Sequence, residues 1–227
     1  LRHLLAEIDP EIKMEGVLVE FGSLIPALKA GRMDIIAAGM YIKPERCMEI
    51  DFSNPTYAIG EGFLVQKGNP KKLHSYEDIK AQEKAIIGVV GGAVEEGYAK
   101  AVGIPDKQIK IFPDADAAVA GVRAGRCDAY AGTALTVQDK ADKDNTGKVE
   151  RALPFTDPVI DGSQVKGYGA FGFRKTDTDL RMKINELLAD FIGSEAHGEL
   201  VRSFGFTKSE LPGEVTAEQL CSGDTTQ

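Results

Sequence analysis

The stretch LIPALKAGRMD, residues 24–34, ends a short apolar helix at Gly31 and leads into an apolar strand. Its last five residues, AGRMD, have a near copy in AGRCD at 124–128, which also follows an apolar helical segment. Glycine ends helices because it takes the left-handed backbone without steric cost. Each copy continues into small residues. The echo therefore predicts two similar lobes, each with a loop at the carboxyl end of a strand, the sheet edge where ligands bind in open α/β folds.

Strands and helices alternate along the rest of the chain. The strand predicted over 33–40 is almost continuously apolar, which is typical of a parallel sheet covered on both faces. Further strands are expected over 15–21, 61–67, 85–90, 109–112 and 127–131, and helices over 24–30, 94–102, 115–124 and 180–191. This alternation predicts an α/β fold with mostly parallel sheets.

Composition excludes several classes of protein. The 227 residues are 43% apolar and 27% charged, as in ordinary globular chains, which argues against a disordered tail or a fibrous rod. Thirty-five acids against 27 bases give a net charge of −8, opposite in sign to most nucleic-acid binders, so no nucleic-acid partner is expected. No apolar run approaches the ~20 residues that a membrane helix needs.

Cysteines and histidines are few and scattered. They are Cys47, Cys127, Cys221, His3, His74 and His197. No pair has the spacing of a zinc or iron–sulfur site, so neither a metal nor another cofactor is expected. Two interpretations of the cysteines stay open: three thiols with no shared role, or one disulfide and one buried thiol in an oxidising compartment.

The chain begins inside an amphipathic pattern, LRHLLAEI, with no capping residue and no signal peptide before it. We therefore expect the natural beginning of the protein to be missing.

One motif has the form G-x-G-x-x-G, in GYGAFG at residues 167–172. A dinucleotide-binding fingerprint must follow a strand and open a helix. Here the extended pattern continues through 173–175, so a glycine-rich strand is predicted instead. No phosphate-binding loop, nucleophile elbow or catalytic carboxylate pair can be recognised, and no enzymatic activity is predicted.

Three features could bind an anion or line a ligand site. Gly91 and Gly92 precede a helix beginning at Val94, where exposed N–H groups attract negative charge. Arg46 follows an apolar strand and suits bidentate capture of a carboxylate. Tyr41 lies in the intervening loop. Each also has a simpler interpretation, as a plain turn, a surface arginine or a packing tyrosine.

LIPALKAGRMD, together with AGM at 38–40, PER at 44–46 and DFSNP at 51–55, resembles the solute-binding proteins of polar amino-acid ABC importers. The similarity extends through 88–95 and 124–128 into the C-terminal helices. It implies the two-lobed type II periplasmic-binding-protein fold, with ligand in the interlobe cleft and two hinge strands. Lobe 1 would comprise 1–66 and 167–227, and lobe 2 would comprise 67–166. Relative to that family, the first strand and the start of the first helix are missing.

The resemblance also implies a ligand site. Arg46 matches the family's carboxylate-binding arginine, and Thr133 falls where amino-acid binders carry an aspartate for the α-ammonium group. That departure argues against a standard L-amino acid. The ligand-binding residues implied are Phe21, Gly39, Met40, Tyr41, Arg46, Gly92, Ala93, Val94 and Thr133.

Within the family, KPERC at 43–47, KGNP at 67–70, GG at 91–92 and the LC of the C-terminal tail are similar to ectoine- and hydroxyectoine-binding proteins. These enclose the ligand's delocalised cation with aromatic rings, and Phe21 and Tyr41 match two ring positions. Both Cys47 and Cys221 fall in lobe 1 of this alignment, which suggests a disulfide between them. Cys127 is expected to be a buried thiol.

The predicted function is capture of a small zwitterionic compatible solute and its delivery to an ABC permease. The protein would be a monomer in the periplasm, or lipid-anchored on the outer face of the cytoplasmic membrane. The alternatives are a binder of another amino acid or betaine, a periplasmic dehydratase on the same fold, and the input domain of a receptor.

Overall fold

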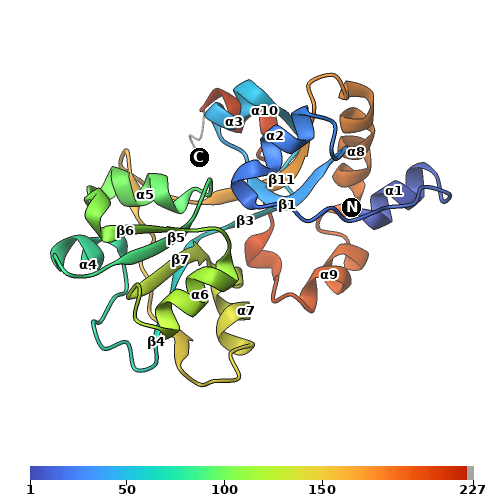
Figure 1. Cartoon of the computed structure of the whole chain (residues 1–227). Helices are drawn as coiled ribbons and strands as arrows, with labels where there is room; N and C mark the ends of the chain where they lie inside the picture. The colour runs from blue at the N-terminus through green and yellow to red at the C-terminus, as the bar shows by residue number, and fades with distance from the viewer. Residues whose placement is uncertain (224–227) are drawn as a thin grey trace. The chain divides into compact units, whose positions relative to one another are not determined.

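The contacts between residues divide the chain into two units. The computed structural model describes residues 1–223 (Figure 1). Unit 1 comprises 1–19, 23–58 and the described residues from Gly167 onward, and unit 2 comprises 20–22 and 59–166. The predicted boundary at residues 66 and 67 differs from this division, because the strand over 61–66 is hydrogen-bonded into the sheet of unit 2. Residues 20–22, predicted to lie in lobe 1, also group with unit 2.

Unit 1 is built on a small sheet with the long strand β11 in its middle. β11 pairs antiparallel with β1 and β2, and β3 also pairs with β11. The strands are β1 (Ile36–Tyr41), β2 (Asp51–Phe52), β3 (Tyr57–Ile59) and β11 (Gly167–Phe173). The glycine-rich strand predicted over 167–172 is thus confirmed.

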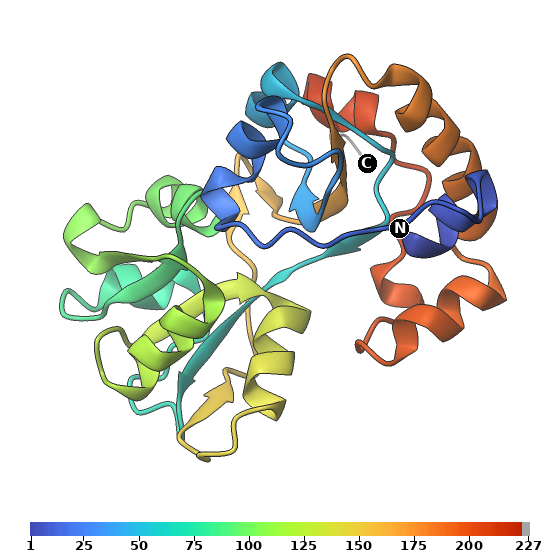
Figure 2. The same cartoon turned by 45° about the vertical axis from the view of Figure 1, so that its right-hand side comes forward.

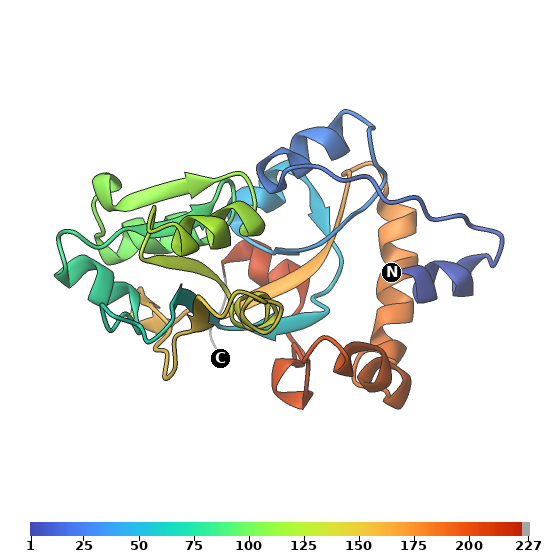
Figure 3. The same ribbon diagram turned by 60° about the horizontal axis from the view of Figure 1, so that its bottom comes forward.

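Helices α1 and α8 pack together beside this sheet, as Figures 2 and 3 show. Their apolar faces share a core in which Leu4, Leu5 and Ile184 are buried against Phe173 of β11. The helices of unit 1 are α1 (Arg2–Ile8), α2 (Leu24–Lys29), α3 (Pro44–Glu49), α8 (Thr178–Phe191), α9 (Glu195–Arg202) and α10 (Ala217–Ser222), with the 3-10 turn η3 (Lys208–Glu210). The 3-10 turn η1 (Phe21–Ser23) has its first two residues in unit 2 and its last in unit 1.

Unit 2 is a five-stranded sheet in the order β6-β5-β7-β4-β8. The strands are β4 (Glu61–Gln66), β5 (Ile87–Val90), β6 (Ile109–Phe112), β7 (Ala129–Thr133) and β8 (Val149–Arg151), and a separate hairpin joins β9 (Val159–Ile160) to β10 (Ser163–Gln164). The helices are α4 (Tyr76–Ala81), α5 (Glu95–Val102), α6 (Ala115–Arg123) and α7 (Ala134–Asp142), with the turn η2 (Asp106–Gln108).

Each face of this sheet has its own core. Leu64 and Tyr130 pack with apolar residues of α6 and α7 on one face. On the other, Phe63 contacts Tyr76 of α4, whose ring meets Tyr98 of α5 edge-on. Side chains of β4 alternate between the two cores, as expected for a strand buried on both faces.

The prediction of mostly parallel sheets is wrong. The β5–β6 and β5–β7 pairs are parallel, but β4 runs antiparallel to β7 and β8, and β11 runs antiparallel to β1 and β2. Parallel pairs need a crossover connection, usually a helix. One residue separates β4 from β3 and two separate β11 from β10, so neither strand enters its sheet from a helix.

The strand predicted over 15–21 is also absent, since the structure has no strand between α1 and η1. Val17 and Leu18 are exposed there. β1 lies at the end of its sheet order, and no described strand pairs with its other edge. Residues 15–20 therefore have no ladder to join, and Ala37 and Ala38 of β1 are exposed rather than covered on both faces.

The echo between 30–34 and 124–128 corresponds to one backbone motif that occurs in both units. Gly31 has φ 69° after α2, and Gly125 has φ 67° after α6. The N–H of Arg32 and the N–H of Arg126 each donate to the carbonyl five residues earlier, at 3.0 and 2.8 Å. This is the Schellman arrangement that closes a helix. The predicted helix–glycine–strand units are confirmed.

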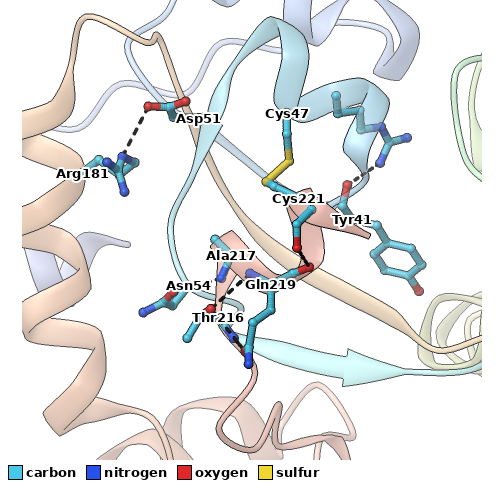
Figure 4. Close-up of a disulfide and its surroundings, with 11 residues drawn as sticks. Tyr41, Cys47, Asp51, Asn54, Arg181, Thr216, Ala217, Gln219 and Cys221 are labelled. Atoms are coloured by element: carbon cyan, nitrogen blue, oxygen red, sulfur yellow. Dashed lines mark hydrogen bonds and ion pairs between the residues drawn. A yellow bond between two sulfur atoms is a disulfide. The ribbon is translucent and has the colours of Figure 1, made fainter. Parts of the chain in front are cut away.

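A disulfide joins Cys47 of α3 to Cys221 of α10, with 5.7 Å between their Cα atoms (Figure 4). α10 is further fixed by its capping residues Thr216 and Gln219, and by the N–H of Ala217, which donates to Asn54 Oδ1 at 3.1 Å. The pairing suggested by the resemblance is therefore present, and Cys127 is a buried free thiol in the core of unit 2.

Candidate ligand-binding site

In unit 1, the predicted ligand loop is the carboxyl end of strand β1. Gly39 has φ 62°, a left-handed backbone that favours glycine. Its carbonyl accepts a hydrogen bond of 2.8 Å from the hydroxyl of Tyr57. The ring of Tyr41 meets the ring of Tyr57 edge-on, with 6.4 Å between centroids. The end of β1 is therefore held from the side by an aromatic residue of β3.

Arg46 lies in the first turn of α3, directly after this strand. Its Nη1 donates to the carbonyl of Tyr41 at 2.8 Å. Pro44 occupies the first position of the helix, where its fixed φ suits the start of a helix and its missing N–H costs nothing. The guanidinium group is thus tied to the backbone at the end of β1, and Arg46 and Tyr41 form one local unit through that bond.

The side chain of Met40 does not belong to this unit's polar surface. It is 2% exposed, and Tyr41, the next residue in the strand, is likewise buried at 4%. Contact of Met40 with a ligand therefore stays a prediction.

In unit 2, the predicted helix-start residues lie between β5 and α5. Gly92 has φ 79°, and the N–H of Ala93 closes the turn onto the carbonyl of Val90 at 3.1 Å. A Cβ on Gly92 would come closer than 3.0 Å to the Cα of Gly22. This close approach places Phe21, the residue before Gly22, beside the turn, and two separately predicted segments are thereby brought together.

The first turn of α5 carries negative charge of its own. Val94 is the N-cap residue, and Glu95 and Glu96 follow it. Acids stabilise a helix N-terminus through its dipole. They also reduce the attraction of this end for an external anion, which the glycine pair alone would have favoured.

Thr133 ends strand β7 and begins α7. Its hydroxyl hydrogen-bonds to that of Thr136 at 2.7 Å. Directly across the antiparallel ladder, its Cα partner is Glu61 of β4. Opposed residues of two antiparallel strands have side chains on the same face, with Cβ atoms about 4.5–5.5 Å apart. A carboxylate is therefore present next to the position where Thr133 lacks one.

Glu61 lies in an acidic, buried part of unit 2. The residue is 3% exposed, and its N–H donates to Asp157 Oδ1 at 2.6 Å. Burial raises the pKa of Asp157, although the N–H of Glu61 and the charge of Arg151 act against this. Burial also raises the pKa of Tyr130, and the charges of Glu95 and Glu61 add to that effect. Carboxylates so placed favour a cation.

Sequence reasoning missed Tyr57 and Glu61. A signal for Glu61 exists, because EGFLVQ at 61–66 has one acid in an apolar strand, and buried acids are rare unless paired. Nothing comparable marks Tyr57. Its role depends on the contact with Gly39, eighteen residues away along the chain.

A separate pocket of about 520 Å³ opens in unit 1 between α9 and η3. Its lining residues fall within 193–211 and include none of the predicted ligand residues. Across residues 1–223, no helix is long and apolar enough to cross a bilayer, and no three acidic, histidine or cysteine side chains are grouped as metal ligands would be.

Comparison with known proteins gives the same family that the sequence resembles. The model of the bacterial extracellular solute-binding proteins, family 3, matches residues 2–207. A probable amino-acid ABC transporter periplasmic-binding protein of Sinorhizobium fredii (strain NBRC 101917 / NGR234) is 44% identical over 218 residues, which cover 95% of this chain and 71% of that protein.

Two solved structures are similar across most of the chain. The crystal structure of EhuB in complex with hydroxyectoine has a TM-score of 0.83 and 32% identity, covering 97% of this chain and 84% of that one. An ancestral amino acid-binding protein, AncCDT-1, described as a precursor of cyclohexadienyl dehydratase, has a TM-score of 0.72 and 27% identity, covering 89% of this chain. The predicted two-lobed α/β fold class is confirmed by these similarities.

Proposed function

The chain belongs to family 3 of the bacterial extracellular solute-binding proteins, and from this premise we propose that it captures a small zwitterionic compatible solute of the ectoine type. The ligand would be passed to the membrane permease of an ABC importer. Arg46 would bind its carboxylate, and aromatic rings together with Glu61 would bind its cationic part.

The observation that carries this proposal is the hydrogen bond from Arg46 to the carbonyl of Tyr41, a residue whose ring meets that of Tyr57 edge-on. A guanidinium group grips a carboxylate through two parallel hydrogen bonds, which a lysine cannot do. The faces of aromatic rings attract a diffuse cation, by about 0.5–2 kcal/mol each according to desolvation. One local unit thus offers partners for both charges of a zwitterion.

Glu61 supports the same assignment and refines it. Thr133 cannot neutralise an ammonium group, but the carboxylate of Glu61 lies across the ladder from it. A ligand cation held by Glu61 and by rings need not be a primary amine. A delocalised cation of an ectoine-like solute matches this mixture of one acid and aromatic faces better than the α-ammonium of a standard amino acid does.

The bound ligand of EhuB, hydroxyectoine, is consistent with this proposal. The second candidate within the class is another zwitterion, such as a betaine or a modified amino acid. It is favoured by the amino-acid ABC transporter description of the Sinorhizobium relative. We propose binding rather than catalysis, delivery in the periplasm or from a lipid-anchored position, and a monomeric state.

Isothermal titration calorimetry of the protein tests the proposal directly. The ligands are hydroxyectoine, ectoine, glycine betaine, proline, glutamate and lysine. We expect hydroxyectoine or ectoine to bind at micromolar concentration or below, which corresponds to roughly −8 kcal/mol. Glutamate or lysine binding tenfold more tightly than ectoine would contradict the compatible-solute assignment. Product formation from prephenate or arogenate would contradict the assignment as a binding protein.

A further inference from the structure

The glycines at 167 and 169 in strand β11 lie under aromatic rings. A Cβ built on Gly167 would come closer than 3.0 Å to three atoms of the Tyr41 ring, and one on Gly169 would come equally close to the ring and hydroxyl of Tyr57. Real Cβ atoms essentially never approach this closely. Any side chain at either position would therefore displace a ring.

Backbone conformation does not account for these two glycines. Neither Gly167 nor Gly169 is among the residues with positive φ, so an L-amino acid could adopt either backbone. Glycine inside a strand weakens it and often marks a place where another group approaches closely. Here the approaching groups are the tyrosine rings. The two glycines are needed because the absence of a side chain leaves room for these rings above the strand.

The two rings are part of a connected set of contacts. Tyr57 donates to the carbonyl of Gly39, and its ring contacts Phe206 edge-on at 5.3 Å on one side and Tyr41 on the other. Gly39 in turn would meet the hydroxyl of Tyr57 if it had a Cβ. The orientation of Tyr41 and the path of the loop before it are thus fixed by the same few contacts.

We propose that Gly167 and Gly169 are positioning residues of the ligand site. Gly167 sets the orientation of the Tyr41 ring, and Gly169 admits Tyr57, which holds the carbonyl of Gly39. This inference rests on the proposed function for its effect on binding, but the seating of the rings exists without ligand. The third glycine of the motif, Gly172, differs, because its Cβ would meet the aliphatic side chains of Ile36 and Ile50.

A double-variant cycle on the full chain tests the proposal, with Gly167→Ala, Tyr41→Ala and the two combined. Gly172→Ala is the control, since it adds the same methyl group to the same strand away from the rings. For each protein, the dissociation constant for hydroxyectoine and the melting temperature without ligand are measured.

We expect Gly167→Ala to weaken hydroxyectoine binding by about tenfold or more, the loss expected when a ring leaves the ligand's cation. Gly172→Ala should change affinity by less than about twofold, while packing strain lowers its melting temperature. In the Tyr41→Ala background, Gly167→Ala should cost no further affinity or melting temperature, because groups in contact are not additive. Wild-type affinity in Gly167→Ala, or fully additive losses in the double variant, would overturn the proposal.

Failure of the proposed ligand and failure of the inference about Gly167 can be distinguished. If the unaltered protein does not bind hydroxyectoine, the proposed ligand is wrong, and the melting temperatures alone then decide the inference. If Gly167→Ala does not fold, folding of the double variant supports the proposal, and failure of both variants contradicts it.

Discussion

Units 1 and 2 use the same helix–glycine–strand turn and continue from it differently. After Gly31, strand β1 ends in Gly39 and Tyr41, and Arg46 follows in α3. After Gly125, strand β7 ends in Thr133, with Glu61 beside it. One repeated backbone motif thus leads to a guanidinium group in unit 1 and to a carboxylate in unit 2. The shared motif positions a strand end, and neighbouring segments determine which charge is placed there.

The two units also differ in the cross-links and ion pairs that stabilise them. Unit 1 has a disulfide that links positions 174 residues apart, from α3 to α10. In unit 2, Cys127 is a buried free thiol, and burial raises its pKa to about 12. Both units contain ion pairs, and the pair of Arg123 with Asp144 in unit 2, at 2.6 Å, has a carboxylate side chain that is only 1% exposed. A reductant should therefore break the disulfide of unit 1 without affecting the ion pair of unit 2, and low pH should weaken the ion pair without breaking the disulfide.

The largest effect is expected from Arg46→Ala, which removes the cation of unit 1. Hydroxyectoine affinity should fall by an amount on the order of 2–5 kcal/mol, the cost of truncating one partner of a buried charge pair. Arg46→Lys should not restore it, because an ammonium group lacks the planar fork. Calorimetry provides the measurement. Arg32→Ala, an exposed arginine in the echoed turn, is the control and should bind as the unaltered protein does.

Replacing both cysteines of the bridge, Cys47→Ser with Cys221→Ser, should lower the free energy of unfolding by about 2–5 kcal/mol. A cross-link over so long a separation restricts the unfolded chain, and that restriction is lost. Urea denaturation measures the change. A reductant should destabilise the unaltered protein and leave the double variant unchanged. If the reductant destabilised both proteins equally, its effect would not come from reduction of the Cys47–Cys221 disulfide.

Glu61→Gln tests whether the carboxylate of unit 2 binds the cationic part of the ligand. Hydrogen bonds to charged groups contribute roughly 1.5–3 kcal/mol, so hydroxyectoine affinity should fall about tenfold or more. Restoring a carboxylate across the ladder, with Thr133→Asp in the same protein, should recover part of the loss, since the two side chains are neighbours on one face. Glu83→Gln, at an exposed position of unit 2, is the control. Undiminished affinity in Glu61→Gln would assign the ligand's cation to the rings alone.

The sequence could predict the features that depend on short stretches. The helix–glycine–strand echo is local, and Arg46 follows its strand within a few residues, so both could be found from composition and spacing. Glu61 and Thr133 are 72 positions apart, and only the register of β4 against β7 brings them together. The direction of β4 and β11, and the unpaired residues 15–20, likewise depend on which strands meet in the sheet. Such pairings are set by the tertiary structure, and the strand propensity of a local stretch does not predict them.

The last prediction concerns Asp144→Asn, which breaks the ion pair with Arg123 but keeps one acceptor oxygen. The side chain of Asp144 is 1% exposed. Burial opposes its ionisation, but hydrogen bonds from the hydroxyl of Thr146 and the N–H groups of Lys148 and Val149 outweigh it and lower the pKa to about 2. An unfolded aspartate titrates near 3.9, so the folded state holds its proton more weakly.

The sign of the pH dependence follows from these two values. Asp144 stabilises the folded protein fully above the unfolded pKa, and that contribution disappears as the pH falls from about 4 toward 2. The melting temperatures of the unaltered protein and of Asp144→Asn should therefore differ at pH 6 and converge as the pH approaches 2. Asp142→Asn, an exposed neighbour, should follow the unaltered protein throughout. A constant difference across this range would show that the charge of Asp144 does not stabilise unit 2, and the comparison between the disulfide of unit 1 and this buried ion pair of unit 2 would fail.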